Sequence, residues 1–165
     1  MAACFWGCVS SALASLSMPT VEGLALGETL NATKKKLGKP LRQNYSTPNV
    51  CNNESLDLQL HYKGMVVTLI ESARHQYIVS DVVITGKPWK LNGVGIGDNS
   101  SAVERKFGRT KTNNGVMPYN KRGEPYGFDF IMHKDKVSKI SYNSYLCWIQ
   151  QHKSGLYIYR PLFNA

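Results

Sequence analysis

The stretch Gly23-Leu24-Ala25-Leu26-Gly27-Glu28 returns 70 residues later as Gly93-Val94-Gly95-Ile96-Gly97-Asp98. Each copy is followed by a short helical pattern that ends with an apolar residue, a glycine and a basic residue. These endings are Leu37-Gly38-Lys39 and Phe107-Gly108-Arg109. Because one offset aligns all these landmarks without a gap, the sequence predicts two copies of one structural unit.

Each unit is expected to hold one helix followed by antiparallel strands. Leu56–His61, which has apolar residues at alternate positions, matches Phe128–His133 at an offset of 72, so two residues are inserted before the second strand. Turns at residues 63–64 and 134–135 lead into return strands. The Asn-, Pro- and Ser-rich segment 39–54 and its counterpart 109–125 are predicted to be loops.

The predicted fold is therefore α+β, with two tandem helix-plus-antiparallel-sheet modules. The first module covers residues 21–88 and the second covers residues 89–165. Residues 1–20 form a leader or signal-like segment. It has an apolar run at Cys4–Val9 and ends near Ala12-Leu13-Ala14, the A-x-A pattern of a cleavage site, but lacks a basic start. The pattern predicts a periplasmic or secreted bacterial protein, and the alternative is a short buried helix.

Composition limits the class of protein. The chain has 165 residues, of which 42% are hydrophobic and 19% charged, which fits a globular protein without a transmembrane span. Its net charge of +9 favours a partner with an acidic surface, and the alternative is a solvated basic surface. We expect that partner to be another protein and not nucleic acid, and we expect the chain to be a monomer.

Two cysteines remain if the leader is removed, Cys51 and Cys147. In an oxidising compartment they could form a disulfide that joins the first module to the end of the second. Two free thiols are the alternative.

Catalytic patterns are weak. Asp57 with His61 and Asp129 with His133 are duplicated, but four residues along a strand separate each pair by about 13 Å. An acid-base or metal pair would need one module's Asp to meet the other's His. No phosphate loop, dinucleotide motif or zinc-ligand spacing is present. We therefore expect no enzyme, cofactor or metal, and a hydrolase with a cross-module His/Asp or Cys/His site is an alternative.

A binding surface is the stronger expectation. Tyrosine and tryptophan residues from Tyr45 to Tyr159 are interleaved with lysines and arginines, a combination that protein interfaces use. The alternatives are stacking on single-stranded nucleic acid and packing of the aromatic residues in the sheets. The predicted contacts are outward-facing strand residues with aromatic residues beside them: Asp57, His61, Tyr62, Tyr126, Asp129, His133, Tyr142 and Trp148.

The unit from Leu26-Gly27-Glu28 to Leu37-Gly38-Lys39-Pro40, followed by a hairpin, resembles the module of the β-lactamase inhibitor protein and BamE-like superfamily. The second copy departs from that pattern with Thr110 in place of proline, and the inhibitor's intra-module disulfides are absent. The resemblance implies paired sheets whose concave face grips another protein, as in an inhibitor or immunity-type protein. It also leaves a cell-envelope assembly accessory protein as an alternative.

Overall fold

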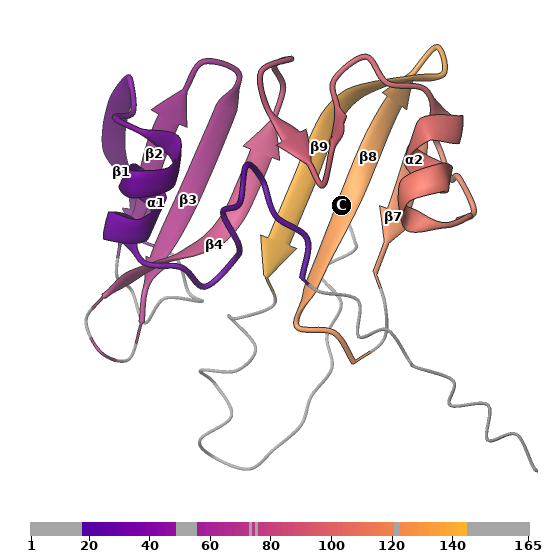
Figure 1. Cartoon of the computed structure of the whole chain (residues 1–165). Helices are drawn as coiled ribbons and strands as arrows, with labels where there is room; N and C mark the ends of the chain where they lie inside the picture. Colours follow the sequence, from indigo (N-terminus) through magenta and orange to yellow (C-terminus); the bar gives the residue numbers. More distant parts are fainter. Residues whose placement is uncertain (1–17, 49–55, 73, 75, 121–122, 145–165) are drawn as a thin grey trace, which may run out of the picture.

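The computed structural model describes residues 18–48, 56–72, 74, 76–120 and 123–144. Its fold is α+β, with a seven-stranded antiparallel sheet in the order β1-β2-β3-β4-β9-β8-β7 (Figure 1). The elements of this sheet and its two helices are α1 (Leu30–Leu37), β1 (Arg42–Pro48), β2 (Leu56–Tyr62), β3 (Met65–Glu71), β4 (Tyr77–Ile84), α2 (Ser100–Phe107), β7 (Val116–Tyr119), β8 (Tyr126–His133) and β9 (Lys136–Ser144). A small hairpin of β5 (Lys90–Leu91) and β6 (Val94–Gly95) precedes α2.

Both helices lie on one face of the sheet (Figure 1). Thr29 caps α1 by accepting a hydrogen bond from the N–H of Ala32, and Asn99 caps α2 in the same way. Gly38 follows α1 with a φ of 79° and Gly108 follows α2 with a φ of 89°, a conformation that side chains disfavour, so the predicted C-terminal ends of both helices are confirmed. Neither described helix is long or apolar enough to cross a membrane.

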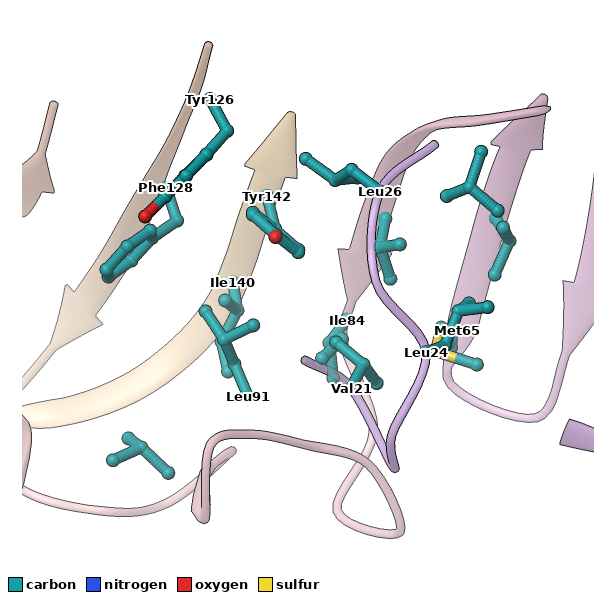
Figure 2. Close-up of a cluster of buried hydrophobic side chains, with 14 of the residues drawn as sticks. Val21, Leu24, Leu26, Met65, Ile84, Leu91, Tyr126, Phe128, Ile140 and Tyr142 are labelled. Atoms are coloured by element: carbon teal, nitrogen blue, oxygen red, sulfur yellow. The ribbon is translucent and has the colours of Figure 1, made fainter. Parts of the chain in front are cut away.

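The core fills the space between the sheet and the segments that cover it. At its centre Val21 forms a bridge with Leu91, and Ile84 pairs with Ile140 across the β4–β9 junction. Tyr142 lies beside them (Figure 2), and all five side chains are at most 1% exposed. Residues from both ends of the described chain therefore share one core.

The same backbone contacts occur in both halves of the chain. The N–H of Gly27 donates to the carbonyl of Val79 at 2.7 Å, and the N–H of Val79 donates to Glu28 at 2.8 Å. Residues 97–98 make the same two bonds with Val137, both at 2.8 Å. These contacts match β4 with β9.

A second pair of contacts matches β2 with β7. The hydroxyl of Tyr62 donates to the carbonyl of Gly38 at 3.1 Å, and that of Tyr119 donates to Gly108 at 2.8 Å. The remaining strands, β3 and β8, then correspond, and each has a register shift against its hairpin partner.

The strand correspondence predicted from the sequence is therefore wrong. That prediction aligned β2 with β8, whereas the contacts align β2 with β7. His61 precedes Tyr62 just as Pro118 precedes Tyr119, so the counterpart of His61 is Pro118 and not His133. The error arose because every half-buried strand alternates with a period of two, so any two strands can be aligned.

Two further expectations are corrected. The segments predicted as loops contain the outermost strands β1 and β7. The strands of the two halves also form one continuous sheet instead of two paired sheets, because β4 pairs directly with β9 through residues 81–84 and 140–143. The predicted boundary near residue 88 lies in the turn between β4 and β5.

Candidate functional site

The predicted strand residues lie on the face opposite the helices. Asp57 and His61 alternate with Leu58 and Leu60, whose side chains belong to the core under the helices. Asp57 is only 8% exposed and is engaged in an interaction, so it is not an open contact residue.

The two Asp/His pairs are not brought together. Asp129 lies on β8, four strands away from β2 in the sheet order, and strands are spaced about 4.8 Å apart. His61 and Asp129 are therefore separated by roughly 19 Å, too far for proton transfer between them. His133 is exposed at the end of β8 and pairs with Lys136. Among the described residues, no group of three or more metal-ligating side chains is found.

Burial shifts the pKa values of two of these residues, His61 and Asp129. Burial lowers the pKa of His61, and the nearby Arg42 lowers it further. Burial raises the pKa of Asp129, and a hydrogen bond from Asn120 opposes this effect. The Nε2 atom of His61 and the Oδ1 atom of Asp129 are buried, and neither has a hydrogen-bond partner among the described residues. Burial on this face thus makes the charged form of each side chain less favourable than it is in water.

The tyrosines predicted to lie beside these residues are not on their face. Tyr62, Tyr126 and Tyr142 are 8%, 8% and 1% exposed, respectively, and all three belong to the core. They point the other way because their strand positions alternate with those of the polar residues. Trp148, Cys51 and Cys147 lie outside the described residues, and so does the leader through residue 17.

A different surface combines exposed apolar and basic side chains. We call it the basic edge, and it lies at the end of α1 and along β1. Leu41 is 78% exposed and Tyr45 is 57% exposed, the two highest values among the exposed large hydrophobic residues of the described chain. The basic edge comprises Lys34 and Lys35 of α1, then Lys39, Leu41 and Arg42, and finally Tyr45 farther along β1, where its ring centroid lies 6.3 Å from that of Tyr77.

The backbone explains why these side chains face outward. Gly38 ends α1, and Pro40 prevents the helix from continuing. The N–H of Leu41 then donates to the carbonyl of His61 at 2.8 Å, which attaches the chain to β2 and leaves the leucine side chain outside. The result is an open hollow, and its lining residues are Lys34, Lys39, Pro40, Leu41, Arg42 and Gln43.

The charges of the basic edge are available to a partner. Lys36 is already occupied, because its ammonium group lies 2.5 Å from Glu28 and donates to the carbonyl of Gly23 at 2.7 Å. Lys34, Lys35 and Arg42 form no ion pair within the described residues, and all are exposed. An exposed leucine surrounded by unpaired cations suits a complementary surface that is acidic with apolar contacts.

The second half lacks this arrangement. At the offset of 70, Lys34 is replaced by the acidic Glu104, and Leu41 is replaced by the basic Lys111. No described strand of the second half corresponds to β1. The basic edge is thus a feature of the first half alone.

The basic edge was not among the surfaces predicted from the sequence. Leu41 and Arg42 fell in a segment predicted to be a loop. One signal could have identified them: Leu41 follows Gly38 and Pro40, so it stands at the start of a new element, and the next residue at an alternate position is the polar Gln43.

No family model and no curated protein matches the chain. A solved structure that is similar to it is that of an extracellular protein containing an SCP domain from Bacillus anthracis, with 15% sequence identity and a TM-score of 0.44. The similarity covers 83% of this chain and 50% of that protein. The chain thus spans about half the length of that protein.

The resemblance to the β-lactamase inhibitor protein and BamE-like superfamily is corrected by these comparisons. No family model matches the chain, and this includes any model of that superfamily. The short motifs that suggested it are a helix cap, a helix end and a tight turn. Many unrelated helix-plus-sheet proteins need the same residues for the same backbone reasons.

Proposed function

We propose that this protein is a non-enzymatic binding module that uses the basic edge to hold an acidic protein partner. The carrying observation is the exposure of Leu41 beside Lys34 and Arg42, which form no ion pair within the part of the chain that the structure describes. A large exposed apolar side chain costs little singly, but its position in a hollow lined by Lys39 and Arg42 gives a partner both apolar contact and charge. The leader-like residues 1–20 favour action outside the cytoplasm.

The proposal includes the origin of the scaffold. We infer that a unit of one helix and three strands was duplicated, with α1, β2, β3 and β4 corresponding to α2, β7, β8 and β9. The recurring contacts of Gly27 and Gly97, and of Tyr62 and Tyr119, support this inference. Duplication leaves β1 as an addition to the first copy, and an element absent from the second copy is free to carry binding.

Affinity capture with matched charge variants tests this function. The full-length protein is immobilised and exposed to lysate of its source organism, and bound proteins are quantified by mass spectrometry. The double variant Lys39→Glu, Arg42→Glu should lose an acidic partner by at least about tenfold, since each reversal replaces attraction with repulsion.

The second half supplies the control. Arg105→Glu, Arg109→Glu produces the same change in net charge on exposed residues of the corresponding helix end. This control should retain the partner at the wild-type level. Equal loss from both variants would show that total charge alone governs retention, and equal retention by all three proteins would overturn the basic edge as the binding surface.

A further inference from the structure

The outer edge of β1 has backbone hydrogen-bonding groups that no described strand pairs with. β1 is the last strand of the sheet, and within the described residues it pairs only with β2. His61 of β2 accepts a hydrogen bond from Leu41, so its backbone groups point toward β1. The backbone N–H and C=O groups of its register partner Arg42 accordingly point toward β2.

In an antiparallel strand, the N–H and the C=O of one residue point to the same side, and those of the next residue point to the opposite side. Since the backbone N–H and C=O groups of Arg42 and Asn44 point toward β2, those of Gln43 and Tyr45 point toward the outer edge. Both side chains are also exposed. The outer edge of β1 therefore presents two residues ready to pair with another strand.

The opposite edge of the sheet is closed to such pairing. The N–H of Met132 donates to the carbonyl of Gly115 at 2.7 Å. By alternation, the backbone N–H and C=O groups of the odd-numbered residues of β7 point toward β8, and those of its even-numbered residues point away from β8. Pro118 then faces the outer edge, where it has no N–H to offer. Its carbonyl already accepts the hydroxyl of Thr110 at 2.8 Å. Only one of the two sheet edges is thus built to accept a strand.

Charge complementarity selects the occupant of the open edge. Arg42 lies on β1, and Lys39 and Lys34 line the hollow at its start, while Leu41 and Tyr45 supply apolar contact. A strand alongside β1 would place alternate side chains near Arg42, where acidic groups are favoured, and the others near Tyr45.

We propose that the partner adds an extended acidic segment to the outer edge of β1 as an eighth strand of the sheet. This inference rests on the proposed function and specifies its mode. Backbone hydrogen bonds to Gln43 and Tyr45 hold the segment, and Lys39 with Arg42 selects acidic residues at alternate positions.

Amide hydrogen exchange tests strand addition on the wild-type protein. The probe is a synthetic decapeptide in which Glu alternates with Thr and Val, and its affinity is measured by fluorescence anisotropy. At saturation the exchange of the Gln43 and Tyr45 amides should slow by at least about tenfold. The amides of Arg42 and Asn44, which face β2, should change far less. The same peptide with alternate backbone nitrogens methylated should bind at least about tenfold more weakly.

Two variants extend the test. Gln43→Pro removes one outward N–H and should weaken binding, whereas Gln43→Ala retains that N–H and should bind as wild type does. If the probe binds and depends on Lys39 and Arg42, but exchange at Gln43 and Tyr45 is unchanged, strand addition is wrong while the binding function stands. A probe whose binding ignores Lys39→Glu, Arg42→Glu would overturn both.

Discussion

The hydroxyl of Tyr142 donates a hydrogen bond to the carbonyl of Pro19, 2.7 Å away in the buried core. The two residues are 123 positions apart in the sequence, so this bond fixes the start of the described chain against β9. Burial raises the pKa of the Tyr142 hydroxyl, which therefore stays protonated and able to donate throughout the neutral range. At the corresponding position in the first half stands Ile84, which has no such bond.

Replacing Tyr142 by phenylalanine should destabilise the protein. The substitution keeps the ring and leaves the carbonyl of Pro19 buried without its donor, which costs about 1–3 kcal/mol. Urea unfolding at pH 7, followed by tryptophan fluorescence, measures the loss as a lower midpoint with an unchanged slope.

Tyr119→Phe is the matched control. Its hydroxyl also donates to a backbone carbonyl, that of Gly108 at 2.8 Å, but the bond lies in an exposed setting where water can replace it. We expect a cost of about 0.5 kcal/mol. Equal costs for Tyr142→Phe and Tyr119→Phe would show that the Pro19 carbonyl finds water when its partner is removed.

Gly64 and Gly86 pack backbone against backbone, which predicts a strong effect of any side chain. A Cβ on Gly64 would lie 2.5 Å from the Cα of Gly86, and Gly64 also has a φ of 74°. Its carbonyl accepts the N–H groups of Thr85 and Gly86, both at 2.9 Å, so the backbone cannot move without breaking those bonds. Gly64→Ala should therefore lower the free energy of unfolding by about 2–4 kcal/mol.

Gly27→Ala separates conformational strain from steric overlap. Gly27 has a similar φ of 83°, but a Cβ there would meet nothing within 4 Å. We expect a cost of about 1–2 kcal/mol from the left-handed conformation alone. Thermal unfolding of both variants measures the difference, and equal losses would mean that the contact between Gly64 and Gly86 relaxes freely.

The sequence predicts the elements of this fold better than their relationships. Helix ends and hairpin turns were predictable because they depend on neighbouring residues, such as Thr29 before α1 and Gly38 after it. β1 was not predictable, since an edge strand with exposed Arg42 and Tyr45 has no buried face to impose alternation. The direct pairing of β4 with β9 depends on contacts far apart in sequence, which no local pattern encodes.

The candidate site illustrates the same limit. Exposure of the lysines of α1 follows from helical spacing, so that part of the basic edge was predictable. The exposure of Leu41 follows from a hydrogen bond to His61, twenty residues later in the chain. The prediction that Tyr62 and Tyr142 lie at the surface was wrong. The alternation of a strand defines two faces but does not show which face the helices cover.

The two helix caps provide a quantitative test of whether the two helices stabilise the fold independently. Thr29 accepts from the N–H of Ala32 at 3.3 Å, and Asn99 accepts from that of Ala102 at 2.9 Å. Thr29→Ala and Asn99→Ala should each lower the unfolding free energy by about 1 kcal/mol. Because the caps share no partner, the double variant should lose the sum of the two, measured by urea unfolding. A sum that differs by more than about 1 kcal/mol would show that the helices are coupled.

Asp81 provides a test of pH dependence. Its carboxyl group lies on the central strand β4, where burial raises its pKa and the nearby Asp57 raises it further, while a hydrogen bond from the Ser80 hydroxyl lowers it. A carboxyl group whose pKa is higher in the folded than in the unfolded state favours folding when protonated. That contribution is present at pH values below the unfolded pKa and is lost as the pH rises through the folded value.

Asp81→Asn should therefore raise the midpoint of thermal unfolding at pH 7, because the amide removes a buried charge and its oxygen can still accept from Ser80. The gain over wild type should shrink as the pH is lowered toward 3, where Asp81 becomes neutral on its own. Calorimetric scans at several pH values measure this convergence. Glu22→Gln, at an exposed position, should show no such gain. A lower midpoint for Asp81→Asn at pH 7 would instead mean that the folded protein stabilises the ionised carboxylate, and that burial is outweighed by the hydrogen bond from Ser80.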